Sequence, residues 1–323
     1  MADTLSIFEN RALDICSVGS VIVKSFTIYI IVFYTPRKMR HFANLLLDQI
    51  IWNFIGNLLF TVAHIIPMLP MVCFRLDGLI TSFVSSEFFG HSFFFAVYLA
   101  ILNCVIAIVL SFQFRYMNVA HESIGNKYHY LFGYLYSALI HLLSCVLYYL
   151  FLNKWTISVD DYPFKTKLSS VEGIFCYHPE GSTKTVAIGG YFLITAVAMF
   201  FSTMFTALAY RHLRSGGRAT HAKTITLQKK LLRIMIYITA VPVILGGVPL
   251  VIAVSTVYFN EMKHAREICV ICIVILANHG TVYGITTLMA FKPYRTTTKR
   301  MFSSMARKLF NRNNWAVSVG SIS

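Results

Sequence analysis

Seven long apolar stretches are the feature that most constrains this chain. They cover approximately residues 14–34, 42–74, 88–119, 130–152, 186–210, 231–258 and 267–291. The hydrocarbon core of a bilayer needs about 20 mostly apolar residues per helix, and each stretch reaches that length. The sequence therefore predicts an all-α membrane protein, a bundle of seven transmembrane helices.

Two other architectures are excluded by the same stretches. Inside hydrocarbon only helices and closed barrels satisfy their own backbone hydrogen bonds, and barrel strands are short and alternate in polarity. A soluble helical bundle needs helices with a polar outer face. The runs Val105–Leu110 and Val251–Val254 contain no polar residue at all.

The composition favours one membrane domain over residues 1–323. Hydrophobic residues make up 57% of the chain and charged residues 13%, whereas soluble domains carry about 25% charged residues. Residues 292–323 form a tail outside the seven stretches. We expect a short amphipathic helix there, lying in the membrane interface, with these residues on its apolar face: Met301, Phe302, Met305, Leu309 and Phe310.

The formal net charge of +15 indicates orientation rather than nucleic-acid binding. Most lysines and arginines fall between stretches one and two, three and four, and five and six, or in the tail, and Glu122 is the only acid among them. By the positive-inside rule, the amino terminus is expected outside and the carboxyl terminus in the cytoplasm, where the basic residues contact anionic lipid. Because Asp3 and Glu9 replace a basic leader region, the first stretch is expected to be a signal anchor.

Polar residues inside the stretches mark helix contacts or cavities. Gln49, Asn53 and Asn57 recur every four residues, and His64 falls on nearly the same side of the helix. This face must point into the bundle. It either hydrogen-bonds to neighbouring helices or lines a hydrated cavity that contains a switch network.

Two ionisable residues also lie within the stretches. Lys24 lies about 15 Å and Asp48 about 9 Å from the inner face at 1.5 Å per residue. Because the Lys24 side chain reaches about 6 Å, the two can form an ion pair if the first two helices are adjacent. The alternative is that Lys24 reaches water or a backbone carbonyl. In the sixth stretch, Pro242 together with Gly246 and Gly247 predicts a kink, and we expect the kink to act as a hinge.

The cysteines and histidines give no metal or catalytic signature. The pair Cys269 and Cys272 has no second pair to complete a zinc site, and His64, His141 and His279 are expected to hydrogen-bond within the core. No motif of an enzyme is present, and no cofactor is expected. Cys73 and Cys176 fall on the outer, oxidising side and are either bridged or free thiols.

A series of short motifs resembles a known family. Listed in chain order, these are Thr35-Pro36-Arg37-Lys38-Met39, Gln113-Phe114-Arg115-Tyr116, Thr226-Leu227-Gln228-Lys229-Lys230, Asn278-His279-Gly280 and Lys292-Pro293-Tyr294-Arg295. Together they resemble the nematode serpentine chemoreceptors of the Str superfamily, nearest to class h, with class i as the close alternative. The resemblance covers all seven stretches.

The resemblance implies a G-protein-coupled chemosensory receptor in the plasma membrane, on the cilia of sensory neurons. Its partners would be a small-molecule ligand and a heterotrimeric G protein, and its oligomeric state is left open. Arg115 matches the family's cytoplasmic arginine. We expect Arg115, Tyr116, Lys229 and Lys230 to contact the G protein; the alternative for Arg115 is an anchor at lipid headgroups. The hinge and polar positions that would relay the signal are Lys24, Asp48, Gln49, Asn53, Asn57, Pro242, Asn278 and His279.

Two other functions fit seven spans. A small-solute transporter would show two three-helix repeats, and a ligand-gated cation channel would show pore-lining charge or a selectivity loop. Neither feature is evident in the sequence. For the receptor we expect an aromatic pocket in the outer half of the bundle, below the loop that carries Cys176. Its expected walls are His64, Phe93, Phe94, Tyr98, Asn103 and Tyr258.

Overall fold

The computed structural model describes residues 4–83, 86–120, 127–167, 173–214 and 222–320. Its helices are α1 (Thr4–Tyr34), α2 (Arg40–Ala63), α3 (Glu87–Ala120), α4 (Lys127–Asn153), α5 (Ser182–Arg214), α6 (Ala222–Pro242), α7 (Val248–Tyr258), α8 (Ala265–Ala290) and α9 (Lys292–Gly320). A π-helical segment, η4 (Val243–Gly247), joins α6 to α7. Because α6, η4 and α7 form one continuous span, the described residues contain seven helices of membrane length. The predicted seven-helix bundle is confirmed.

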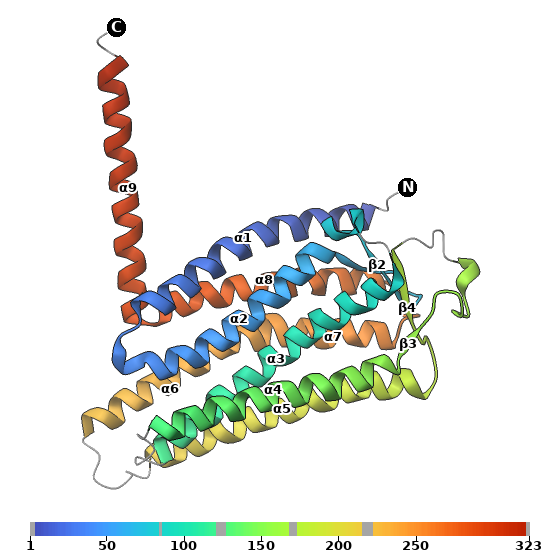
Figure 1. The fold of residues 1–323 in the computed structure, drawn as a ribbon, viewed down its shortest axis with the longest axis horizontal. Coiled ribbons are helices and arrows are strands. Elements are labelled where there is room, and N and C mark those ends of the chain that lie inside the picture. Colours follow the sequence, from blue (N-terminus) through green and yellow to red (C-terminus); the bar gives the residue numbers. More distant parts are fainter. Residues whose placement is uncertain (1–3, 84–85, 121–126, 168–172, 215–221, 321–323) are drawn as a thin grey trace.

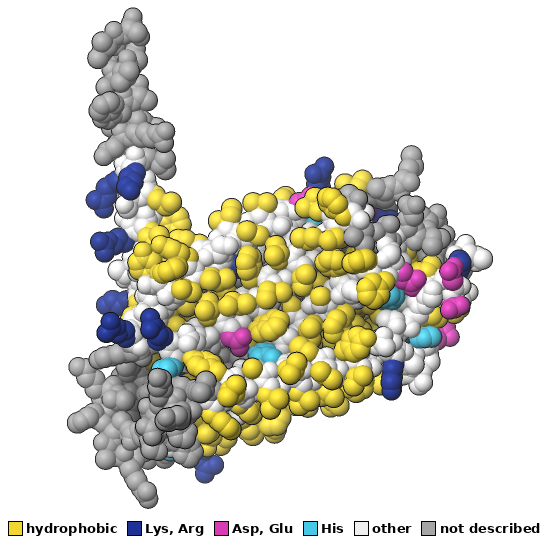
Figure 2. Space-filling model, viewed as in Figure 1, with side chains coloured by type: hydrophobic (Ala, Val, Ile, Leu, Met, Phe, Trp, Pro, Cys, Tyr) yellow, Lys and Arg dark blue, Asp and Glu magenta, His cyan; other side chains and the backbone are white. Residues whose placement is uncertain are grey.

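The helices of the bundle run side by side along one axis (Figure 1). Hydrophobic side chains cover the sides of the bundle, and most of the visible Lys and Arg lie at the end that carries α9 (Figure 2). Large apolar side chains such as Val18, Leu193 and Phe200 point outward with more than half of their surface exposed. A continuous apolar surface around seven helices of membrane length is the surface expected of a bundle surrounded by lipid.

A small antiparallel sheet covers the end of the bundle opposite α9. Its strands are β1 (Ile65–Pro67), β2 (Cys73–Leu76), β3 (Thr156–Ile157) and β4 (Ile174–Tyr177), in the order β1-β2-β4-β3. Cys73 and Cys176 face each other across β2 and β4 and form a disulfide. The bond ties the hairpin after α2 to the segment that precedes α5. Short 3₁₀ turns lie at Arg37–Met39, Leu79–Ser82 and Lys165–Lys167.

The second span is shorter than its apolar stretch. The sequence predicted a helix over 42–74, but α2 ends at Ala63, where His64 takes a left-handed conformation with φ of 40°. Pro67 and Pro70 follow, and proline both removes a backbone donor and disfavours helix in the residue before it. The remaining apolar residues become β1 and β2, because an apolar run alone does not distinguish a buried strand from a helix.

Two chain ends differ from the expected lengths. The first helix starts at Thr4, ten residues before the predicted stretch, and Arg266 donates to Ser6 Oγ at 2.9 Å there. The expected tail helix is present as α9, a 29-residue helix that turns away from the bundle (Figure 1). Phe302 lies 5.6 Å from the ring of Phe26 on α1. The side chains of Leu309 and Phe310 lie outside the described part.

Where the sequence predicts a kink in the sixth span, the structure has the π-helical segment η4. Pro242 has no N–H to donate to the preceding turn, so the regular α-helical ladder is broken there. A Cβ atom on Gly246 would lie 3.1 Å from His279 Cδ2. The missing side chain therefore allows η4 to approach α8 closely.

Candidate functional site

A cavity of about 500 Å³ lies in the centre of the bundle. Its walls come from α1, α2, α3, α5, the α6–η4–α7 span and α8, with Tyr148 added from α4. Lys, Arg, Asp and Glu are absent from the described residues that line it. The volume is that of a typical small-molecule site, and the mostly apolar lining with a few polar groups is typical of one.

Aromatic side chains close the cavity toward the sheet. Phe175 and Tyr177 on β4 have no exposed surface, and Trp155 stands 4.5 Å from the ring of Tyr177. A second cavity of about 40 Å³ is lined by Trp155 and by further aromatic side chains, among them Phe74 and Phe94. Tyr98 and Tyr191 line both cavities and so form part of the partition between them. Burial also raises the pKa of Tyr177 well above its ordinary value, so this phenol stays neutral.

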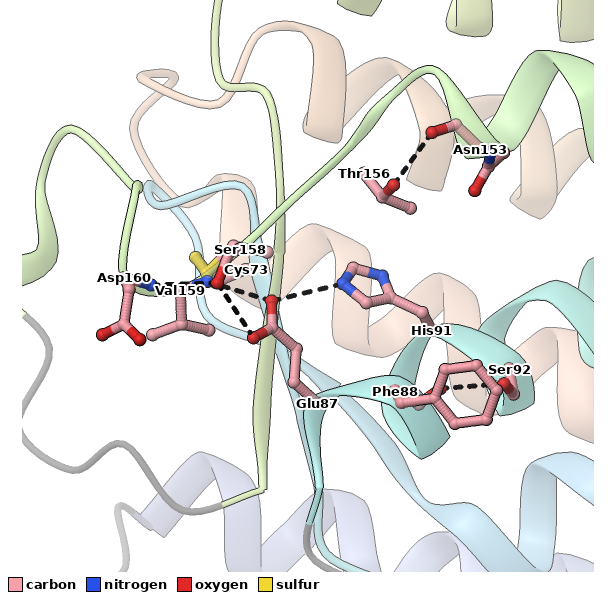
Figure 3. A network of polar contacts seen from close by, with 11 residues as sticks. Cys73, Glu87, Phe88, His91, Ser92, Asn153, Thr156, Ser158, Val159 and Asp160 are labelled. Carbon is pink, nitrogen blue, oxygen red and sulfur yellow. Dashed lines mark hydrogen bonds and ion pairs between the residues drawn. A yellow bond between two sulfur atoms is a disulfide. The ribbon is translucent and has the colours of Figure 1, made fainter.

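Glu87, the first residue of α3, holds the loop after β3 against the bundle (Figure 3). Its carboxylate accepts a hydrogen bond from the backbone N–H of Val159 at 2.9 Å and from Ser158 Oγ at 3.4 Å. His91 Nε2 lies 3.5 Å from the same carboxylate. With the disulfide, these contacts fix the roof formed by the sheet.

The structure does not assemble the predicted outer pocket as one site. Of its expected walls, Tyr98 alone lines the described central cavity, and Phe94 lines only the small one. Phe93 and Tyr258 pack against the aromatic cluster under the sheet. Asn103 points to α4, where its Oδ1 accepts from His141 Nδ1 at 2.6 Å.

His64 is also outside the cavity. Its Nδ1 lies 3.0 Å from Asn10 Oδ1 and its Nε2 lies 3.7 Å from Asp14. Burial lowers the pKa of His64 despite the nearby carboxylate. The residue therefore ties the end of α2 to the start of α1.

Sequence reasoning missed the walls contributed by α5 and by Trp52. Thr195, Ser202 and Thr206 on α5 all line the cavity. Their spacings of seven and four residues place them on one helical face. That periodicity of hydroxyl groups in an otherwise apolar span was the available signal. Trp52 carried no comparable signal, because an aromatic residue in an apolar span is equally suited to lipid or core.

The polar face of α2 hydrogen-bonds to α8 and α1. Tyr283 OH donates to Gln49 Oε1, and Asn53 Nδ2 donates to His279 Nε2 at 2.6 Å. His279 Nδ1 in turn donates to the carbonyl of Leu276, which fixes the neutral tautomer. Asn57 Nδ2 donates to Ser20 Oγ at 2.8 Å and to the carbonyl of Ala277 at 2.9 Å. The predicted hydrogen bonding to neighbouring helices is thus present, and Asn53, Asn57 and His279 also line the cavity, whereas Gln49 and His64 do not.

Lys24 and Asp48 do not form the predicted ion pair. Lys24 Nζ donates to the carbonyl of Asn53 at 3.2 Å, and Asp48 Oδ2 lies 3.4 Å from His141 Nε2 on α4. Positions 48 and 53 are separated by about 140° around a helix. Asp48 therefore faces α4 while Asn53 and Lys24 face α8. Asn278 takes part in neither the Lys24–Asn53 contact nor the Asp48–His141 contact. Its Nδ2 lies 2.8 Å from Cys16 Sγ on α1.

At the α9 end of the bundle, Arg115 connects α3 to α6. Its side chain is 8% exposed and donates from Nη2 to the backbone carbonyl of Gln228 at 2.9 Å. The ring of Tyr116 stacks 6.2 Å from that of Phe205 on α5. Lys229 and Lys230, next to Gln228, are exposed. These expected coupling residues therefore lie around one junction of α3, α5 and α6.

Seven membrane-length helices, a disulfide-braced roof and a central cavity together define a seven-transmembrane helix bundle with an internal small-molecule cavity. The family model of the serpentine type 7TM GPCR chemoreceptor Srh matches residues 6–304. The chain therefore belongs to the Srh family of chemoreceptors and is a multi-pass membrane protein, which confirms the resemblance drawn from its motifs. A search of curated proteins finds no match.

Proposed function

We propose that this receptor binds a small molecule in the central cavity and, in response, activates a heterotrimeric G protein at the α9 end. The observation that carries the proposal is the continuity between the cavity and the sixth span. Pro242, Gly246 and Gly247 line the cavity at the point where the α-helix is interrupted. A ligand there contacts the element best able to change shape.

The polar network provides the link to the rest of the bundle. His279 and Asn53 line the cavity and hydrogen-bond to each other, while Gly246 packs on the His279 ring. A ligand that favours another position of η4 must therefore alter the contact between α8 and α2. Ligands shift such an equilibrium only through contacts that differ between the two states.

The junction around Arg115 is the proposed coupling site. The guanidinium is buried against α6 and bonds to a backbone carbonyl, whereas a headgroup anchor would keep its charge at the membrane surface. Displacement of the inner end of α6 would release Arg115 and open a groove bordered by Tyr116, Lys229 and Lys230. Such a groove accepts a helix of the G protein.

The orientation and location belong to the same proposal. The gathering of Lys and Arg at the α9 end (Figure 2) supports a cytoplasmic position for this end and an outer position for the sheet. The receptor would reside in the plasma membrane of ciliated sensory endings. Epitope tags at both termini, stained before and after permeabilisation, test the orientation; a carboxyl-terminal tag accessible on intact cells would contradict it.

The function is tested by a screen of small molecules in cells that report calcium, cyclic nucleotides and membrane current together. The proposal predicts responses that need both the receptor and a G protein. A current that persists when G proteins are inactivated would indicate a channel instead. Uptake of the compound without either second messenger would indicate a transporter.

A further inference from the structure

The roof blocks the direct route from the outer aqueous side to the cavity. The rings of Phe74 and Phe94 lie 4.8 Å apart, and Phe175 and Tyr177 close the space beside them with no exposed surface. Protein interiors packed in this way contain few voids larger than a water molecule. A ligand from the outer solution would have to displace the disulfide-braced sheet.

A different side of the cavity is open. Among the described residues that line it, the exposed side chains are Met199, Thr203, Ile236 and Ile244. Met199 is 46% exposed and Ile244 is 60% exposed. All four lie on α5 or on the α6–η4 part of the sixth span, in the middle of these helices, where the outer surface is apolar. The opening therefore faces the hydrocarbon of the bilayer.

The interrupted helix helps to keep this opening. Gly247 lines the cavity, and a Cβ atom there would meet nothing closer than the carbonyl oxygen of Pro242 at 3.9 Å. On α5, Thr203 and Ser202 present small side chains to the same space. Small residues on both sides leave a gap that larger side chains would fill.

The lining chemistry matches this route. With no Lys, Arg, Asp or Glu on the described walls, a charged ligand would lose its hydration without gaining a counter-ion. The amides of Asn53 and Asn57 and the hydroxyls of Thr195 and Thr239 can bond to one or two neutral polar groups. Such a molecule also dissolves in the bilayer.

We propose that the ligand is an uncharged, mainly apolar small molecule with one or two hydrogen-bonding groups, and that it enters the cavity from the bilayer between α5 and the α6–η4 segment. The proposal rests on the proposed function for the identity of the cavity as the ligand site. It adds the chemical class of the ligand and the path by which it arrives.

Photolabelling of the purified receptor in lipid nanodiscs tests the route. One probe is an uncharged aryl diazirine that partitions into the bilayer, and the other is its membrane-impermeant sulfonated analogue in the water. Adducts are mapped by mass spectrometry at Tyr98 and Cys104, which line the cavity, and at the lipid-facing Leu193 as an internal reference. The bilayer probe should label all three, and the sulfonated probe should label neither Tyr98 nor Cys104.

Blocking variants then test the opening. Thr203→Trp with Ile244→Trp should abolish labelling of Tyr98 and Cys104 and leave Leu193 labelled. The matched control, Val197→Trp with Val248→Trp, adds the same bulk at exposed positions of the same two spans that do not line the cavity. It should label like the unmodified receptor. Met199→Trp alone is the second blocking variant if the double variant does not fold.

Three results would overturn the inference: labelling of Cys104 from water, no labelling of the cavity by the bilayer probe, or full labelling in a folded blocking variant. None of these measurements uses a G protein. A receptor that activates a G protein while its cavity is labelled from water would retain the proposed function and refute the route. A receptor that is labelled as expected but never activates a G protein would retain the route and refute the proposed function.

Discussion

Lys24 lies in the middle of α1 with 1% of its surface exposed and bonds to a carbonyl rather than to a carboxylate. A Cβ atom on Gly280 would collide with the end of this side chain and with Asn53 Oδ1. The glycine of the Asn278-His279-Gly280 motif is thus the position that gives Lys24 its space. The depth of an ionisable residue in a span can be predicted from its position in the sequence, but its partner depends on the rotation of each helix.

The separation of Lys24 from Asp48 predicts independent effects on stability. In Lys24→Met, Asp48→Asn and the double variant, the changes in unfolding free energy should add to within about 0.5 kcal/mol. Lys24→Met should be neutral or stabilising, because it replaces a buried charge with an apolar side chain of similar length. Thermal unfolding in nanodiscs measures all three. If the double variant were more stable, by over about 1 kcal/mol, than the sum of the two single changes predicts, Lys24 and Asp48 would have to interact as an ion pair.

Arg115 gives a second prediction at this scale. Arg115→Ala removes the bond to Gln228 and the charge at the proposed coupling groove, both far from the cavity walls. It should retain ligand binding and lose ligand-stimulated nucleotide exchange by about tenfold, which is within the usual range of coupling free energies. Arg211→Ala, at an exposed basic position at the same end of α5, is the control and should exchange normally. Normal exchange per surface receptor in Arg115→Ala would remove Arg115 from the mechanism.

At the scale of elements, the predictable features were those with a local cause. Length and apolarity predict the seven spans, and Pro242 with two glycines predicts the break that appears as η4. The polar face of α2 follows from four-residue spacing. The hairpin at 65–76 was missed because its apolar residues continue the preceding span without a change in composition. Its second strand, β2, pairs with β4, about a hundred residues later.

The two adjacent glycines of η4 allow a matched test of the contact with α8. Gly246→Ala should destabilise the receptor by about 1–3 kcal/mol, because the His279 ring must shift to admit the new methyl group. In Gly247→Ala the new methyl group makes only an ordinary contact, 3.9 Å from the carbonyl oxygen of Pro242, so the change should be neutral or stabilising by about 0.5–1 kcal/mol. The melting temperatures of the two variants in the same lipid measure this difference in stability. Equal effects would show that η4 does not pack closely on His279.

The disulfide provides a prediction for the roof. Cys73→Ser opens a bond that closes a loop of 103 residues, and loss of such a bond typically costs about 2–5 kcal/mol. Surface expression and melting temperature should both fall. The control is Cys145→Ser at a free, partly exposed cysteine, expected within about 0.5 kcal/mol of the unmodified receptor. Unchanged stability of Cys73→Ser would show that the sheet holds without its covalent bond.

At the scale of the whole molecule, the cavity is the feature that sequence patterns could not supply. Its walls come from all seven spans, so a correct list needs the rotation and packing of every helix. Outward position and aromatic character selected residues such as Phe93 and Tyr258, which instead build the cluster below the roof. The family, in contrast, was readable from short motifs, because each motif is a local run of residues that can be recognised without knowing how the helices pack.

In the proposed function, occupancy of the cavity activates a G protein. The direct measurement is the rate of GTP-analogue exchange on a purified heterotrimeric G protein, with the receptor in nanodiscs and each compound that gives a cellular response. The rate should rise with compound concentration. Gly247→Trp, which fills the cavity from η4, should abolish the rise while the receptor remains folded. If a compound evoked the cellular response but left the exchange rate unchanged with several G proteins, the receptor would not signal by activating a G protein.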